Sequence, residues 1–181
     1  MTRPLILLLG ASGSGKSTVA IELEKRYGLH QMCSYTTREP RFEGEPGHEF
    51  IDYQTFLELM MDHKLVASTE INGFFYGATK EMVDNCDIYV IDPRGAIELH
   101  DLYDSERLIF YVYLDVSPDE RARRMTERGT EKEAAERRDA DSEIDLQSRE
   151  AGSLFDAALY IENTDFESCV QTIAEFVGLK E

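Results

Sequence analysis

Apolar and polar residues follow two different periods along this chain. Short, almost wholly apolar runs are typical of strands buried in a parallel sheet. They occur at Pro4–Leu9, Asp87–Ile91, Leu108–Leu114 and Ala157–Ile161. Segments with apolar residues at helical spacing lie between or after these runs, among them Val19–Tyr27, Thr79–Asn85, a short helix from Arg94 and Phe166–Val177. Strands that alternate with helices predict an α/β fold whose parallel sheet is covered on both faces.

A different pattern interrupts this alternation between residues 33 and 78. A second strand is expected at Leu29–Tyr35, and a turn-rich stretch with several glycines and prolines follows it. Tyr53–His63 has helical spacing, and Leu65–Ile71 alternates like an exposed strand. Asn72-Gly73 is a hairpin signal leading to Phe74–Tyr76. Residues 33–78 therefore form a predicted small lobe inserted in a core of residues 1–32, 79–117 and 151–181.

A polar segment at 118–150 interrupts the core again. Ser117-Pro118-Asp119-Glu120 is a favourable helix start, because it has a capping serine, a proline at the first position and acids in the first turn. That helix is expected to end near Glu127. Glu131–Glu150 is almost wholly polar and helical in pattern. Such a helix cannot belong to a core, so we expect a solvent-facing or mobile cover.

The strongest chemical signal is the stretch Gly10–Thr18, which fills every position of the pattern G-x-x-x-x-G-K-[ST]. It lies between a predicted strand and a predicted helix, and this context argues against a chance glycine- and serine-rich turn. Glycines allow successive N–H groups to converge on phosphate oxygens, while Lys16 and the helix start add positive charge. The hydroxyl of Ser17 can ligate Mg²⁺. The motif predicts a site for the phosphates of a nucleoside triphosphate.

Arginines form two groups. Arg38 and Arg41 lie in a turn-rich segment beside several hydroxyl groups, and guanidinium groups match phosphate oxygens bidentately. Simple surface pairing with Glu39, Glu43 and Glu45 is the alternative for these two. The second group lies on or beside the polar helices, where it could stabilise a transferring phosphoryl group or merely pair with glutamates along the helix. It consists of Arg121, Arg123, Arg124, Arg128, Arg137 and Arg138.

Composition narrows the classes of partner. The formal net charge of -17 argues against binding to nucleic acid or to an anionic membrane, and its simplest interpretation is a solvated acidic surface. We see no apolar run that approaches a membrane span and no signal-peptide pattern. The three cysteines lack metal-ligand spacing and cannot all pair, which favours a reducing cytoplasm.

The order of these motifs resembles that of the guanylate kinases, over essentially the whole chain. The motifs after the glycine-rich loop are Ser34–Arg41 with Gly44-Glu45 and Gly47, Phe75-Tyr76-Gly77, Ile91–Ala96 and Arg128-Gly129-Thr130. The resemblance implies a single domain, 1–181, with a three-layer P-loop NTPase core, a monophosphate-binding lobe at 33–78 and a helical lid at 118–150. It implies transfer of the ATP γ-phosphoryl group to GMP or dGMP with Mg²⁺, giving GDP or dGDP in purine nucleotide metabolism.

Site residues follow from this resemblance by position. ATP would be bound by Ala11, Ser12, Gly13, Ser14, Gly15, Lys16, Ser17 and Thr18, with Asn163 at the adenine and Ser17 as the Mg²⁺ ligand. The monophosphate would be bound by Ser34, Arg38, Arg41, Tyr76 and Asp92. Catalysis would use Lys16, Arg38, Arg128 and Arg138. Because the lid is one residue shorter than usual between Arg128 and Arg138, Arg137 could replace Arg138.

The chain departs from the family where guanine should be read. Ala67 stands where the family has a glutamate that accepts hydrogen bonds from guanine, and Ala78 stands where it has a serine. Phe50 replaces a tyrosine that would meet the phosphate. Loss of a charge-assisted pair from a base pocket costs about 2–5 kcal/mol. Glu70 could compensate if the strand register allows it.

Two alternatives therefore stay open. A related kinase could use another nucleotide or a ribose phosphate, which Ala67 and Ala78 favour, whereas the retained segment Thr36–Arg41 favours a nucleoside monophosphate. A non-catalytic guanylate-kinase-like binding module is the second, and the intact Lys16 argues against it. The expected partners are small-molecule nucleotides, with no nucleic acid and no membrane. We expect a cytoplasmic monomer or homodimer.

Overall fold

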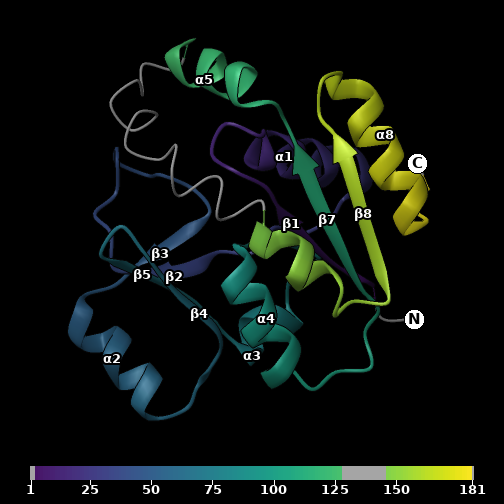
Figure 1. Ribbon diagram of the computed structural model, residues 1–181. Coiled ribbons are helices and arrows are strands. Elements are labelled where there is room, and N and C mark those ends of the chain that lie inside the picture. The colour runs from purple at the N-terminus through teal and green to yellow at the C-terminus, as the bar shows by residue number, and fades with distance from the viewer. Residues whose placement is uncertain (1–2, 128–145, 181) are drawn as a thin grey trace.

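Two four-stranded sheets organise the computed structural model, which describes residues 3–127 and 146–180 (Figure 1). All strand pairs in the first sheet are parallel. Its order is β6 (Ile88–Val90), β1 (Leu5–Leu9), β7 (Ile109–Asp115) and β8 (Ala157–Glu162). The predicted α/β fold with a parallel sheet is confirmed.

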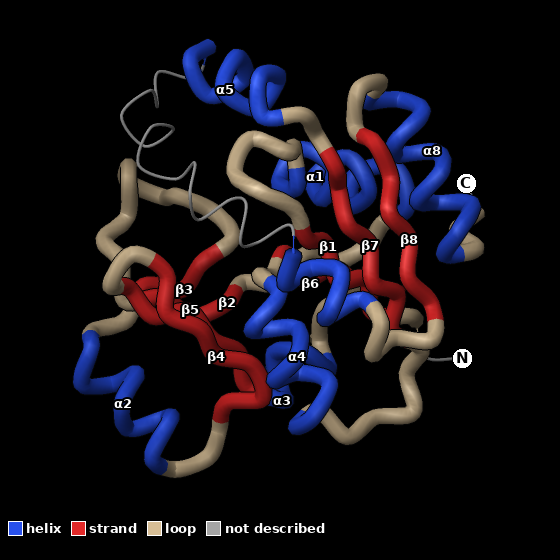
Figure 2. The backbone as a smooth tube through the Cα atoms, in the orientation of Figure 1, coloured by secondary structure: helices blue, strands red, loops and turns tan. Residues whose placement is uncertain are grey.

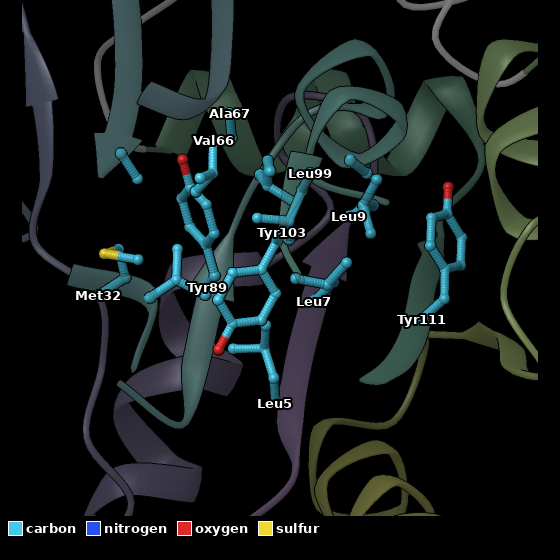
Figure 3. Packing of buried hydrophobic residues seen from close by; sticks show 14 of the residues in the cluster. Leu5, Leu7, Leu9, Met32, Val66, Ala67, Tyr89, Leu99, Tyr103 and Tyr111 are labelled. Carbon is cyan, nitrogen blue, oxygen red and sulfur yellow. The ribbon is translucent and has the colours of Figure 1, made fainter. Parts of the chain in front are cut away.

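Side chains of β1 alternate between two layers of the core, as the period of two along a strand requires. Ile6 and Leu8 pack with α1 (Lys16–Tyr27) and α8 (Phe166–Val177). Leu5, Leu7 and Leu9 belong to one buried cluster with Val83 of α3 (Lys80–Asp84) and Leu99 of α4 (Pro93–Leu102), and Figure 3 shows the three leucines with Leu99. All five β1 residues have no exposed surface, and each such side chain contributes about 1.5–3 kcal/mol when buried. The sheet is thus covered on both faces.

Local chemistry fixes where the helices begin and end. Asp92 caps α4 and Pro93 occupies its first turn, while Asp165 caps α8 by accepting from the Ser168 N–H at 2.7 Å. α8 ends at Gly178, which has a positive φ of 77°. The predicted range of α8 is matched residue for residue because both of its ends carry such signals.

The second sheet lies beside the first and is built from residues 34–79 (Figure 2). Its order is β3 (His48–Phe50), β2 (Ser34–Thr36), β5 (Phe74–Thr79) and β4 (Leu65–Ile71), with α2 (Tyr53–Met61) between β3 and β4 in the chain. β2 pairs parallel with β3 and antiparallel with β5. The expected hairpin is present, with β4 and β5 antiparallel.

The predicted single strand Leu29–Tyr35 is wrong. Its first half runs along the edge of the first sheet, where Met32 N donates to Ile88 O at 2.7 Å and Asp87 N donates to His30 O at 2.7 Å. Only a bridge at Gln31 forms there. The chain then crosses to the second sheet, where β2 begins. The single stretch 29–35 is shared by two sheets, and hydrophobic periodicity cannot show where a chain crosses from one sheet to another.

β4 joins the second sheet to the core. The backbone N–H and the hydroxyl of Ser68 both donate to the Glu98 carboxylate on α4, the latter at 2.7 Å. Val66 and Ala67 belong to the same buried cluster as Tyr89 and lie beside it in Figure 3. The base of the second sheet is therefore fixed against α4.

The polar segment is only partly described. α5 (Pro118–Glu127) begins where predicted, with the Glu120 N–H 3.4 Å from the Ser117 hydroxyl. Most of Glu131–Glu150 lies outside the described residues, and residues 146–152 are helical. Within the described ranges no helix is both long and apolar enough to cross a membrane. The three cysteines are free thiols.

Candidate active site

The glycine-rich loop adopts a conformation that needs its glycines. Gly10, Gly13 and Gly15 have φ values of +145°, +80° and +95°. A Cβ atom on Gly10 would lie 2.7 Å from the Leu114 carbonyl oxygen, and one on Gly15 would lie 2.7 Å from Asn163 Nδ2. The loop is therefore wound too tightly for side chains at these positions. This is the geometry in which backbone N–H groups can surround a phosphate.

Lys16 curls back over this loop. Its ammonium donates to the carbonyl oxygens of Gly10 at 2.7 Å and Ala11 at 3.1 Å. No side chain among the described residues caps the N-terminus of α1, and Ser17 and Thr18 are exposed in its first turn. The Ser14 hydroxyl is buried and has no hydrogen-bond partner within the described part of the chain. A charged side chain, an uncapped helix start and a buried polar atom thus meet at one loop.

The side chain of Asn163 is hydrogen-bonded to the backbone of the glycine-rich loop. Asn163 follows β8, is 3% exposed and donates from Nδ2 to the Ser14 carbonyl at 2.8 Å. Arg124 on α5 donates to the Asn163 carbonyl at 2.7 Å and pairs with Glu120 at 2.8 Å. Asn163 therefore supports the loop, a role that sequence reasoning missed, and its contact with adenine stays a prediction. Arg123 also pairs with Glu120. Arg123 and Arg124 therefore pair with a glutamate on their own helix, which was the alternative to a role in phosphoryl transfer.

A cavity of about 670 Å³ connects the loop to the second sheet. Gly10, Ser12 and Lys16 line one end. The predicted monophosphate residues line the rest, and they are Ser34, Arg38, Arg41, Tyr76 and Asp92. The fold therefore brings together residues that are far apart in sequence.

Arg38 and Arg41 are held by one carboxylate. Arg38 donates to both oxygens of Glu45 at 2.8 and 3.1 Å, and Glu45 also accepts from the Arg41 N–H at 2.6 Å. The hydrogen bond from Arg38 holds the pKa of Glu45 below its usual value. The Arg38 guanidinium also lies 5.4 Å from the centroid of the Phe50 ring. Both arginines thus pair with Glu45, which was the alternative considered for them, and both also lie in the cavity wall.

Asp92 lies where β6 leads into α4. Its Oδ1 accepts from the N–H groups of Arg94 at 3.0 Å and Gly95 at 3.2 Å. Burial raises the pKa of Asp92, and these N–H groups and the Thr69 hydroxyl oppose the rise. Asp92 is therefore a fixed acceptor in the cavity wall.

The positions expected to read guanine carry no polar side chain. Ala67 lines the cavity, and Ala78, directly opposite it in the β4–β5 ladder, is fully buried. Glu70 is exposed and does not line the cavity, whereas its neighbour Thr69 does. Because adjacent strand residues face opposite sides, the register directs Glu70 away from the cavity.

His48 and Thr69 are among the cavity residues that sequence reasoning missed. His48 Nδ1 lies 3.1 Å from the Ser34 hydroxyl, on the adjacent strand. Thr69 is two residues after Ala67 on the same strand. The alternation of β4 could have indicated Thr69. His48 could not be placed, because β3 is too short for periodicity to fix its facing.

Magnesium would find few protein ligands here. In residues 3–127 and 146–180 no group of three His, Cys, Asp or Glu side chains could hold a metal ion. The exposed Ser17 hydroxyl at the start of α1 fits a single protein ligand, and Mg²⁺ in such sites commonly takes the rest from water and substrate phosphates. The predicted arginines 128, 137 and 138 lie outside the described residues.

Comparison with known proteins agrees with this geometry. The AAA domain family matches residues 6–145. The guanylate kinase of Trichormus variabilis is 33% identical over 179 residues, which cover 93% of this chain and 86% of that protein. The guanylate kinase of Clostridium tetani is 33% identical over 138 residues, 71% of this chain and 65% of its own length. The crystal structure of guanylate kinase from Anaplasma phagocytophilum aligns with a TM-score of 0.65 and 25% identity, covering 98% of this chain and 85% of that one.

The loop, the cavity and these relatives lead to one assignment. A P-loop and an arginine-lined wall face the same cavity, as a transfer between two phosphorylated ligands requires. The likeness extends over both sheets and nearly the whole chain. The chain therefore belongs to the guanylate kinase family, and it is a phosphotransferase with the role of a nucleoside monophosphate kinase.

Proposed function

We propose that this chain transfers the γ-phosphoryl group of ATP to GMP or dGMP, giving GDP or dGDP. The observation that carries the proposal is the single cavity that Lys16 shares with Arg38, Arg41 and Tyr76. Phosphoryl transfer depends mainly on positioning and on stabilisation of charge, so donor and acceptor phosphates must meet in one space. The names of the relatives support GMP as the acceptor.

Each part of the cavity has a role in this proposal. The loop N–H groups and the uncapped start of α1 bind the ATP phosphates, and Lys16 exchanges its two carbonyl partners for phosphate oxygens. Arg38, Arg41 and Tyr76 hold the acceptor phosphate. Mg²⁺, when bound, neutralises charge on the transferring group, and Ser17 would be its protein ligand. The lobe 33–78 and the lid 118–150 would close over both nucleotides.

The experiment is an ADP-release assay with ATP, Mg²⁺ and a panel of acceptors. We expect GMP and dGMP to give turnover, and Lys16→Ala to remove it while circular dichroism and Tm stay near wild type. Lys25→Ala, an exposed lysine in the last turn of the same helix and outside the cavity lining, is the matched control and should keep near wild-type activity. Wild-type turnover by Lys16→Ala would overturn the proposal.

A second candidate acceptor follows from Ala67 and Ala78. Because this part of the wall offers no carboxylate or hydroxyl at those two positions, another nucleotide or a ribose phosphate could be the better substrate. The same panel distinguishes the two, since a ribose phosphate needs no contact with a base. A higher kcat/KM for ribose phosphates than for GMP would favour the second candidate.

A further inference from the structure

His48 lies where an acceptor phosphate would contact it. It is half-buried at the edge of the second sheet and lines the cavity with Arg38 and Arg41. Its ring centroid is 5.6 Å from that of Tyr76. Since Nδ1 is engaged with the Ser34 hydroxyl at 3.1 Å, Nε2 is the nitrogen that can meet a ligand.

The end of the cavity near Arg38 and Arg41 carries less positive charge than a phosphate dianion needs for neutralisation. Arg38 and Arg41 supply two positive charges, but both contact Glu45, whose side chain is only 8% exposed. Glu45 therefore cancels about one of them. Two other acids line the cavity: Glu39 is exposed and screened by water, and Asp92 accepts from the N–H groups at the start of α4. A second positive charge close to the phosphate would complete the balance, and His48 can supply it.

The surroundings of His48 make its charge depend on what is bound. Burial lowers the pKa of His48 from its usual value, and the charges of Arg38 and Arg41 lower it further, while the hydrogen bond with Ser34 and the charge of Glu45 act in the opposite direction. Without a ligand the imidazole is therefore mainly neutral at pH 7. A dianion placed among His48 and the two arginines would reverse this repulsion and favour the imidazolium form.

We propose that His48 binds the phosphate group of the acceptor through its Nε2–H, and that each acceptor dianion takes up one proton from solvent as it binds. The inference rests on the proposed function only in requiring a phosphate monoester as acceptor. The proton from solvent forms an N–H bond on the imidazole and stays there until the phosphate leaves, and no other bond is made or broken. Because binding raises the pKa of His48, acceptor binding weakens as pH rises from the pKa of the free protein to the higher pKa of the complex, and is independent of this group above it.

Direct titration tests the protonation step without any turnover. The Cε1–H signals of the four histidines are followed by NMR against pH, and His48 is assigned by its absence in His48→Asn. The probes are inorganic phosphate and sulfate, since sulfate stays dianionic throughout. We expect either anion to raise the pKa of His48 by about one unit or more. An unchanged His48 titration in saturating anion overturns the proposal.

Kinetics test the consequence for the acceptor. In wild type we expect KM for the monophosphate to rise with pH between the lowered pKa of His48 in the free protein and its higher pKa in the complex, with kcat nearly constant. In His48→Asn we expect a KM about tenfold higher near pH 7 and no such rise. His30→Asn, an exposed histidine in the connection from α1 to β2, should match wild type. An alkaline rise that persists in His48→Asn refutes the inference, whereas anion-dependent titration without any kinase activity refutes only the proposed function.

Discussion

Asn163 offers a test of how the phosphate-binding loop is held in place. Its side chain amide donates to the Ser14 carbonyl at 2.8 Å, and both residues are almost completely buried. Asn163→Ala removes this donor and leaves the carbonyl oxygen without its side-chain partner. The Cβ position of Gly15 lies only 2.7 Å from Asn163 Nδ2, so the loop is packed directly on this side chain. We therefore expect the substitution to loosen the loop before any nucleotide is bound.

The magnitude follows from the burial of the pair. A buried acceptor left unsatisfied costs about 1–3 kcal/mol. In a protein of this size one kcal/mol lowers Tm by about 2–4 °C. A central loss of about 2 kcal/mol therefore lowers Tm by about 4–8 °C.

Thermal unfolding of the nucleotide-free protein measures the effect. Asn163→Asp is the matched control, because it keeps the size of the side chain and replaces the donor with an acceptor facing a carbonyl oxygen. Its Tm should fall at least as far as that of Asn163→Ala. If Asn163 acts mainly on adenine, both variants keep the wild-type Tm and lose the preference for ATP over GTP. An unchanged Tm in both variants would refute the structural role.

Two further expectations concern stability and base preference. Arg107→Ala should lower the free energy of unfolding by about 3 kcal/mol or more in urea denaturation, because the buried guanidinium group donates to the carbonyl oxygens of residues 3, 4, 83 and 86 at 2.8–3.1 Å. The control is Arg3→Ala, which changes an exposed arginine and should lower the free energy of unfolding by about 1 kcal/mol or less. Equal losses in the two variants would contradict this account. The double variant Ala67→Glu, Ala78→Ser should raise kcat/KM for GMP relative to AMP more than tenfold, or about 1.4 kcal/mol. Glu70→Ala should leave that ratio unchanged, because Glu70 does not line the cavity, and loss of GMP preference in Glu70→Ala would show that the register argument is wrong.

Sequence predicted the first sheet better than the second for a physical reason. A strand such as β1 is buried on both faces, so it is apolar throughout and stands out from its surroundings. β2 and β3 have three residues each, and their pairing is fixed by neighbours distant in sequence. Helices with a capping residue at the start and glycine at the end, such as α8, were predicted closely. Local sequence signals are therefore sufficient to predict the elements of the core, whereas the strands of the second sheet depend on pairing between residues distant in sequence.

The candidate site divides in the same way. Lys16 and its loop were evident because the whole motif is local, and Arg38 and Arg41 because two arginines stand close together in an acidic chain. The support of the loop by Asn163 depends on a contact across 149 residues, which no local pattern encodes. His48 depends on the facing of a three-residue strand. The contacts that sequence analysis missed are those between distant residues that no local motif indicates.

Two helices start at the cavity, and their caps determine which of them can bind phosphate. Lys16 of α1 and Pro93 and Gly95 of α4 line it, so both helices direct positive dipole ends towards it. In α4 the Asp92 carboxylate already accepts the first N–H groups and cancels much of that potential. The start of α1 has no side-chain cap among the described residues. A protein with a net charge of -17 must attract phosphates locally, so in the proposed function we expect the donor phosphates at α1, beside Lys16. Asp92 is then available as an acceptor for hydrogen-bond donors of the other substrate, which is the role that the start of α4 can still perform.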